Sequence, residues 1–476
     1  MPLILPGNVA TATASTGYEI ANSCMFQDSG SAEMSRAIAS TGSNTTWTVS
    51  AWVKRVELGQ SSPIFGTGDG NANNDARMVF FDADDKIECS YYNSGYTYEV
   101  TTNRLFRDCS AWYHICILFD TTESTASNRI KIYVNGTQET SFATSSYPDE
   151  DAAFNFGNTS FTHFVNDMGG RNIRGSHYIA ELVYIDGTAS AVTNFGEYDS
   201  DSPTIWKPID VSGLSVGTNG VYLDFEDSGN LGNAVDGGTD FTEGGLAATD
   251  QATDTPTNNF CVMNPLDNFY QGSTFTEGNL QVVMDTSGVE SYNTSTFAVS
   301  KGKWYCEVKY SAASSKTITG VASELPKAIG TVLANEEYTW GYEGENGNAK
   351  NDGNGVSYGD SYTTNDIISI ALDLTNNKVY FAKNGTWQNS GDPTSGATGT
   401  GAAHSVTAVA STRDGVYYFG SGKRHADSVT SQWNFGGCPA FTISSGNADA
   451  DGYGNFEYAV PSGYFSLCSK NLAEYG

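Results

Sequence analysis

The sequence predicts an all-β protein in which two antiparallel β-sandwiches are joined by an ordered connector. Many runs alternate apolar and polar residues with the two-residue period of a half-buried strand. Turn-forming residues separate these runs: the chain has 52 glycines, and no long stretch places apolar residues at helical spacing. With 476 residues, the chain is longer than one hydrophobic core usually requires, so we expect two domains.

Four alternating runs make up the first half of the chain. They are WTVSAWVKR at 47–55, SAWYHICILFD at 110–120, RIKIYVNGT at 129–137 and YIAELVYIDG at 178–187. In the last run, strict alternation puts Ile179, Val183 and Ile185 on one face. The third run ends in Asn135-Gly136, a pair that suits a two-residue hairpin turn because both positions adopt positive φ there. We therefore expect an antiparallel sandwich at 1–198.

The second half repeats this plan. Its runs are KWYCEVKY at 303–310, IISIALDL at 367–374, KVYFAKNGTW at 378–387, SVTAVAS at 405–411 and GVYYFGSG at 415–422. One of them again ends in an Asn-Gly pair, Asn384-Gly385, so we expect both pairs to be hairpin corners rather than sites of chemistry. No helical pattern lies between the runs, which favours a second antiparallel sandwich at 269–443.

The segment between the two sandwiches differs in composition. Residues 199–268 are rich in Asp, Gly, Thr and Asn, and they contain one good strand within NGVYLDFED at 219–227. We interpret this segment as an ordered connector with one strand, which is able to complete either sandwich. Residues 444–476 are again rich in Gly and Asn and form a C-terminal loop and tail.

The charge of the chain excludes one class of partner. The formal net charge is −30 and the sequence pI is near 4.3, so the protein repels nucleic acid. An acidic surface fits a solvated coat, bound cations or neutral glycans. The N-terminal MPLILPGNVA lacks a basic region and a long apolar run, so we expect no signal peptide, and no segment is apolar enough for membrane insertion.

The eight cysteines predict buried thiols. They show no CxxC spacing, and several lie inside apolar runs such as HICILF and KWYCEVKY. In a chain of this length, free buried thiols are a better interpretation than a disulfide framework.

Several segments resemble known families. The motifs GKWYCEVKY, GVASE, DIISIALDLTNNKVYFAKNGTW and QWNFGG, within 295–441, follow each other as in a SPRY domain. Residues 18–198 resemble a laminin G or concanavalin A-like jelly roll. The joining segments, such as SPTIWKPIDVSGL and GVYLDFEDSGNLGN, resemble structural proteins of tailed bacteriophages, especially marine ones. The resemblance implies two concanavalin A-like sandwiches in a virion component of the kind labelled tail fibre or receptor-binding protein.

Concanavalin A-like folds also include glycosidases, which carry paired carboxylates. Such enzymes need a nucleophile and an acid across the scissile bond, and on a strand these acids occupy alternate positions. In VYLDFED, Asp224 and Glu226 alternate, but Tyr222 stands where a further carboxylate is expected. The sequence therefore predicts no enzyme and no catalytic residues.

Two loops resemble the start of a calcium-binding loop. The first has oxygen-bearing residues at alternate positions before Gly452, with a glutamate one position short of the usual twelfth: Asn447, Asp449, Asp451 and Glu457. The second has similar spacing without the glycine: Asp69, Asn71, Asn73 and Asp75. The alternative for each is a polar turn in which Asn and Asp side chains bind their own backbone.

Five aromatic residues are candidate ligand contacts. A glycan is bound by an exposed ring beside hydrogen-bonding side chains, because a sugar has an apolar face and polar edges. Tyr358 and Tyr362 flank a loop and are expected to be half exposed, and Trp387 follows the second Asn-Gly corner. Tyr92 and Tyr96 belong to a hairpin rich in tyrosine. The alternative for every one of them is packing in the core.

These observations together lead us to expect a non-enzymatic virion protein that is assembled in a bacterial cytoplasm. As a tail fibre or receptor-binding protein it would recognise a host surface glycan or another virion subunit, as a homo-oligomer whose weak contacts add up. Two alternatives stay open, namely a capsid decoration protein that stabilises the head, and a glycan depolymerase.

Overall fold

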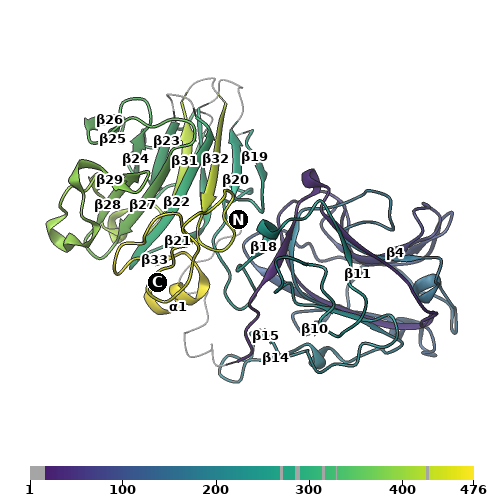
Figure 1. Ribbon diagram of the computed structural model, residues 1–476. Helices are drawn as coiled ribbons and strands as arrows, with labels where there is room; N and C mark the ends of the chain where they lie inside the picture. Colours follow the sequence, from purple (N-terminus) through teal and green to yellow (C-terminus); the bar gives the residue numbers. More distant parts are fainter. Residues whose placement is uncertain (1–16, 269–271, 285–289, 314–316, 329, 425–427) are drawn as a thin grey trace. The chain divides into compact units, whose positions relative to one another are not determined.

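The computed structural model describes residues 17–476 except 269–271, 285–289, 314–316, 329 and 425–427 (Figure 1). Strands dominate it, and in the described residues the one α-helix is α1 (Ser469–Tyr475). The chain forms two compact units, the first at Ala14–Thr257 and the second containing Asn258–Gly476. The predicted all-β fold with antiparallel sandwiches is confirmed.

The first unit is a sandwich of two sheets, which we call the β3 sheet and the β5 sheet. The β3 sheet has the order β10 (Thr137–Gln138), β9 (Ile130–Val134), β8 (Trp112–Asp120), β3 (Thr46–Arg55), β13 (His177–Asp186), β1 (Ser23–Phe26) and β18 (Gln251–Ala252), with β16 (Val221–Leu223) also paired to β13. The β5 sheet has the order β11 (Phe142–Ser146), β7 (Tyr96–Thr102), β6 (Ile87–Tyr92), β5 (Asp75–Phe81), β4 (Ser62–Gly68), β12 (Thr162–Val165), β2 (Glu33–Ala37) and β17 (Thr242–Gly244).

The core of the first unit lies between these sheets. Trp47 of β3 is fully buried and stacks on Phe119 of β8 with ring centroids 5.0 Å apart. Tyr98 of the β5 sheet packs against the same Phe119 ring, with the ring centroids 5.4 Å apart. Burying aromatic side chains of this size supplies much of the energy that holds two sheets together. The alternating runs at 47–55 and 110–120 therefore form strands of the sandwich, β3 and β8, as the sequence predicts.

One register prediction was wrong, because β13 contains a bulge. The pairing of β13 with β3 shifts between Ala180 and Val183, and Glu181 adopts φ 47°. The extra residue turns the rest of the strand over. Ile179 consequently faces the core between the sheets, whereas Val183 and Ile185 lie in a second apolar cluster on the outer face of the β3 sheet.

The segment after 198 is not a connector with one strand. It contains β15 (Trp206–Pro208), β16, β17 and β18. β15 pairs with β14 (Gly196–Tyr198), and the other three pair with strands of the first sandwich. The segment up to residue 257 therefore belongs to the first unit, and its Gly- and Asp-rich composition reflects the turns between short strands.

The second unit is a second sandwich. One sheet has the order β19 (Thr274–Thr276), β20 (Gln281–Met284), β32 (Val429–Asn434), β22 (Lys303–Ala312), β27 (Ile367–Asp373), β28 (Lys378–Lys383) and β29 (Thr386–Trp387), with β30 (His404–Ser405) on β28 and β33 (Phe465–Ser466) on β22. The other has the order β21 (Ser291–Val299), β31 (Tyr417–Lys423), β23 (Thr317–Ala322), β24 (Thr339–Glu343), β25 (Asn348–Asn351) and β26 (Asn354–Ser357). The strand expected at 405–411 is wrong except for Ser405, because the chain turns into a 3₁₀ segment at Val409–Ser411.

Both Asn-Gly pairs are hairpin corners, as predicted. Asn135 and Gly136 have φ 48° and 74°, and Asn384 and Gly385 have φ 49° and 78°. Each corner also lies under an aromatic ring from a distant segment. A β-carbon on Gly136 would come within 2.2 Å of the Trp206 ring. Glycine is therefore required at these corners both by conformation and by space.

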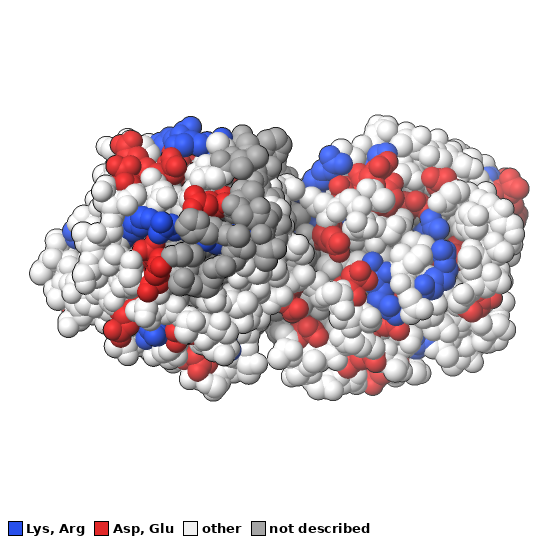
Figure 2. Space-filling model, turned by 90° about the horizontal axis from the view of Figure 1, so that it is seen from above, with Lys and Arg blue, Asp and Glu red and all other residues white. Residues whose placement is uncertain are grey.

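The eight cysteines are all free and buried, in agreement with the sequence. Burial raises the pKa of the Cys109 and Cys468 thiols to about 12, which keeps both protonated at neutral pH. On the face shown in Figure 2, basic side chains lie beside carboxylates rather than in a patch of one sign. No helix in the described part of the chain has the length and apolarity needed to cross a membrane.

The corner at Gly385 predicts a measurable cost of substitution. A β-carbon there would lie 2.6 Å from Cδ1 of Tyr458, so Gly385→Ala adds a clash to the strain of a positive φ. We expect the free energy of unfolding to fall by about 2–4 kcal/mol in denaturant titration. Gly353→Ala is the matched control, because Gly353 has φ 72° in another hairpin with no neighbour within 4 Å, and it should cost only about 1 kcal/mol. Equal costs would contradict the role of Tyr458.

Candidate binding surface on the beta5 sheet

The predicted calcium ligands of the C-terminal loop are held by the protein itself. The Oδ2 atom of Asp449 accepts hydrogen bonds from the backbone N (2.9 Å) and hydroxyl (2.8 Å) of Ser466 and from the amide of Asn471 (2.8 Å). Its Oδ1 atom accepts from the backbone N–H groups of Asp451 and Tyr453, both at 3.0 Å. Asp449 therefore ties the tail together as a hydrogen-bond hub.

The other predicted ligands of this loop point elsewhere. The Asn447 amide donates to the Glu457 carbonyl at 3.0 Å, and the Glu457 carboxylate accepts two hydrogen bonds from Ser444. In the earlier loop, Asp69 accepts from the backbone of Asn71, which repeats the pattern with Asn73, as in polar turns. Within the described residues, no group of three His, Cys, Asp or Glu side chains could hold a metal ion. Calcium binding stays a prediction that this geometry does not support.

The aromatic candidates of the second unit are packed. Tyr358 is 7% exposed and Tyr362 is 2% exposed, so the expectation of half-exposed rings is wrong. Their hydroxyls donate to the Phe381 and Tyr342 carbonyls. Trp387 is partly buried against an apolar cluster beneath β28. These rings therefore serve the core rather than offering a free face to a ligand.

The structure gives Tyr92 and Tyr96 a different setting. Tyr91 and Tyr98 of the same hairpin face the core, whereas Tyr92 and Tyr96 face outward from the β5 sheet. Their rings meet edge to face with centroids 5.4 Å apart, and Tyr96 is 47% exposed. This pair forms an aromatic platform on the outer face of the sheet.

A network of charged side chains continues from this platform. Nη1 of Arg77 donates to the Tyr96 hydroxyl at 2.9 Å and to Glu88 Oε1 at 3.1 Å. Its Nε lies 3.3 Å from Asp75 Oδ2, which also accepts from Arg171 Nη1 at 2.9 Å. Each cation on this face is thus paired with a carboxylate.

Burial shifts the pKa values of the charged groups in this network. Desolvation raises the pKa of the Glu88 carboxyl, although Ser90 and Arg77 oppose the rise. For Arg77, desolvation acts to lower the pKa, but Glu88 and Asp75 outweigh it and the pKa is raised. The arginine therefore stays charged while it holds both carboxylates.

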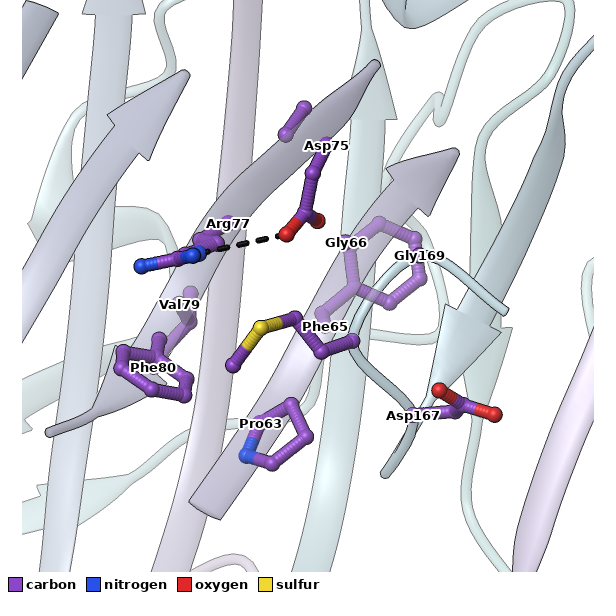
Figure 3. A pocket seen from close by; sticks show the side chains of 11 residues that line it. Pro63, Phe65, Gly66, Asp75, Arg77, Val79, Phe80, Asp167 and Gly169 are labelled. Atoms are coloured by element: carbon purple, nitrogen blue, oxygen red, sulfur yellow. Dashed lines mark hydrogen bonds and ion pairs between the residues drawn. The ribbon is translucent and has the colours of Figure 1, made fainter. Parts of the chain in front are cut away.

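A small pocket adjoins the network (Figure 3). Its lining comes from β4, β5 and the loop after β12: Pro63, Phe65, Gly66, Asp75, Ala76, Arg77, Val79, Phe80, Asp167, Met168 and Gly169. The Asp75 carboxylate lies beside Gly66, and the Asp167 carboxylate is turned away from the pocket (Figure 3). Burial and the neighbouring Glu33 raise the pKa of Asp167 to about 6, against the effect of Arg174.

A buried acid elsewhere in the first unit is not indicated by any sequence motif. Glu181, at the bulge of β13, accepts hydrogen bonds from the hydroxyls of Tyr222 (2.8 Å) and Tyr18 (2.9 Å). Burial, followed by the nearby charges of Asp224 and Glu226, raises its pKa to about 7, although both tyrosines lower it. Pairing of β16 with β13 brings Tyr222 to Glu181, a contact that alternation within VYLDFED could not reveal.

Comparison with known proteins identifies both sandwiches at the domain level. A family model described as the concanavalin A-like lectin/glucanases superfamily (Laminin_G_3) matches residues 28–171, and the SPRY domain model matches residues 303–416. A Ran-binding proteins 9/10 homolog of Drosophila melanogaster is 37% identical over 51 residues, which are 10% of this chain and 5% of that protein.

Solved SPRY domains are similar to part of the chain. The SPRY domain of human HERC1 is 16% identical, with 37% of this chain and 97% of that chain covered and a TM-score of 0.28. A human SPRY domain is 14% identical, with 32% and 90% covered and a TM-score of 0.23. On the two family matches, the chain has an N-terminal laminin G/concanavalin A-like domain and a C-terminal SPRY domain.

The Asp449 hub predicts a loss of stability on substitution. Asp449→Ala removes the acceptor for buried donors of Ser466 and Asn471, so the free energy of unfolding should fall by about 2–4 kcal/mol. Asp451→Ala, at an exposed position of the same loop, should change it by less than about 0.5 kcal/mol. Thermal melts with Ca²⁺ and with EDTA should coincide, whereas a rise in Tm with Ca²⁺ that both substitutions abolish would establish the calcium site.

Glu181 predicts a pH dependence of stability. Burial raises its pKa from the ordinary value of 4.5 to about 7 in the folded state, so folding favours the protonated form. Its contribution to stability is largest below pH 4.5, falls as the pH rises, and has been lost above pH 7. Glu181→Gln cannot ionise, and it should raise the free energy of unfolding by about 2 kcal/mol at pH 8 but not at pH 4. Denaturant titrations at both pH values measure this, and an equal effect at both would contradict it.

Proposed function

We propose that this protein is a non-enzymatic adhesion component of a tailed bacteriophage particle, a tail fibre or receptor-binding protein that recognises a host surface glycan. The observation that carries the proposal is the aromatic platform of Tyr92 and Tyr96 beside the Arg77 network. An exposed ring binds the apolar face of a sugar, and charged or polar side chains next to it bind the hydroxyls.

The charge balance of the surface favours a neutral ligand. Arg77 and Arg171 are matched by Asp75 and Glu88, so no unpaired cation is left to attract an anionic polymer. The net charge of −30 acts against anionic ligands at longer range. A neutral glycan meets neither obstacle.

The same pairing speaks against hydrolysis. A retaining or inverting glycosidase needs one carboxylate free to attack or to activate water, and a second that carries a proton. Asp75 is bound by two arginines, and Glu88 is bound by Arg77 and Ser90. Carboxylates held in this way bind and orient a ligand but make poor nucleophiles, which supports a binding role.

The resemblance of the joining segments to phage structural proteins supports a place on a virion. In that setting the SPRY unit is available to contact another virion protein, and a homo-oligomer would multiply weak contacts of the platform with a host surface. A capsid decoration protein is the alternative, and it requires no glycan binding.

The platform is tested by binding of the purified full chain to a glycan array and to candidate host cells. Tyr96→Ala should weaken binding at least tenfold, because it removes the exposed ring and one of the hydrogen-bond partners of Arg77. Tyr198→Ala is the matched control: this tyrosine, 43% exposed, lies in the same unit on the β14 strand and should leave binding within twofold. Locating the chain in the particle by electron microscopy completes the test. If the chain lies on the head and binds neither glycans nor cells, the adhesion role is wrong and the capsid decoration role is supported.

A further inference from the structure

The chain contains five Asn-Gly pairs, and the structure gives them different settings. In such a pair the backbone nitrogen of glycine is able to attack the side-chain amide carbon of asparagine, because glycine has no side chain to hinder the approach. The attack requires an asparagine side chain that is free to turn and a glycine N–H that is not already hydrogen-bonded. The pairs are Asn135-Gly136, Asn219-Gly220, Asn346-Gly347, Asn354-Gly355 and Asn384-Gly385.

Two of the pairs are held at the hairpin corners. Oδ1 of Asn135 accepts a hydrogen bond from the backbone N of His114 at 2.7 Å. Oδ1 of Asn384 accepts one from the backbone N of Ile367 at 2.9 Å, and its amide also donates to Asp366 at 2.7 Å. These side chains are tied to neighbouring strands and are not free to turn toward the following nitrogen.

Two other pairs are blocked in different ways. Asn219 is 7% exposed, and its amide donates to the Ser40 carbonyl at 2.9 Å. Asn346 is exposed, but the N–H of Gly347 donates to the Glu343 carbonyl at 3.0 Å. The first pair therefore lacks a free side chain, and the second lacks a free nitrogen.

The remaining pair meets both conditions. Asn354 and Gly355 begin β26, whose residues are all exposed and which ends the order of strands in its sheet (Figure 1). Asn354 faces Asn351 across a two-residue turn, Asp352-Gly353, with φ 48° and 72°. In such a hairpin the pair that flanks the turn is hydrogen-bonded and the next pair is not, so the Gly355 N–H points away from β25.

Local opening of β26 brings the reacting atoms together. The extended strand keeps the nitrogen away from the amide carbon, so the pair has to leave β25 before it reacts. β26 pairs with β25 alone, and opening a short edge strand costs far less than global unfolding. The Asn354 amide donates to the Asp352 carbonyl at 3.0 Å, and this exposed bond is lost at little cost.

We propose that Asn354 is a site of spontaneous deamidation in the folded protein. The Gly355 nitrogen gives its proton to water and bonds to Cγ of Asn354, the amide nitrogen leaves as ammonia, and a cyclic imide forms. Water then opens the imide at either carbonyl and gives aspartate or isoaspartate, so the whole reaction consumes one water and releases one ammonia. The modification is independent of the proposed function.

The product changes the edge of the second unit. Either product places a new negative charge on β26, since an aspartate side chain is ionised at neutral pH. Isoaspartate also adds a methylene to the backbone, so β26 cannot pair with β25 in its original register. The reaction therefore releases β26 and leaves β25 as the new edge of the sheet.

Peptide mass spectrometry of the full chain, incubated at mildly alkaline pH, tests the proposal. A urea-unfolded sample gives the intrinsic rate of each pair, and the folded rate is expressed relative to it. The relative rate should be at least tenfold higher at Asn354 than at the two corner pairs and at Asn219. Asn346 is the matched control for exposure, and it should also convert more slowly because the N–H that follows it is bonded.

Gly355→Ala is the test variant, because its methyl group hinders the attacking nitrogen. The β-carbon would lie 3.2 Å from the end of the Asn348 side chain, which is able to move, so the midpoint of denaturant unfolding should stay unchanged. Conversion of Asn354 should fall severalfold, with the other pairs unaffected. Unchanged conversion in this variant, or a relative rate at Asn354 no higher than at the corner pairs, would overturn the proposal. Equal relative rates at Asn346 and Asn354 would overturn the role of the free Gly355 N–H.

Discussion

A buried ion pair sets the organisation of the first unit. Nζ of Lys54 in β3 lies 2.6 Å from Oδ2 of Asp254, and both side chains are 1% exposed. The Trp112 indole donates to the other oxygen of Asp254 at 3.0 Å. Removing one member of such a pair costs about 3–5 kcal/mol, because the other charge stays buried alone. The contact fixes the segment that follows β18 against the β3 sheet, and together with the apolar cluster around Val183 it occupies the outer face of that sheet. The polar side chains that could meet a ligand therefore gather on the opposite sheet.

Much of the fold could be predicted from the sequence, because period-two alternation reports directly on half-buried strands. The failures have separate physical causes. A bulge adds one residue without breaking the apolar pattern, so the reversal of β13 at Glu181 left no sign in YIAELVYIDG. The segment after residue 198 is mostly turns. Its strands of two or three residues are too short to show an alternating pattern, and they are defined by their pairing with strands of the sandwich.

The candidate site was predictable only in part. The tyrosine hairpin is visible in the sequence, but the outward orientation of Tyr96 is not. Simple alternation would put Tyr96 on the same face as Tyr98, which lies in the core, and a register shift between Tyr91 and Tyr92 separates the two rings. The pairing of Asp75 with Arg171 joins residues 96 positions apart, and nothing in local spacing indicates it. Tyr358 and Tyr362 were expected to be half exposed from the sequence but are buried in the structure. An aromatic residue next to a loop has the same sequence pattern whether its ring packs into the core or faces solvent. In this protein both rings pack into the core. Asp449 likewise has the spacing of a cation ligand, but backbone and side-chain donors of its own chain satisfy it.

The distribution of the free thiols has a practical consequence. Four cysteines lie in each unit, and all eight are buried. A sulfur enclosed in this way reacts with an alkylating reagent only when the surrounding sheets separate. The rate at which the cysteines of each unit are alkylated therefore reports how often that sandwich opens. Mass spectrometry of the labelled peptides would measure this rate separately for each unit.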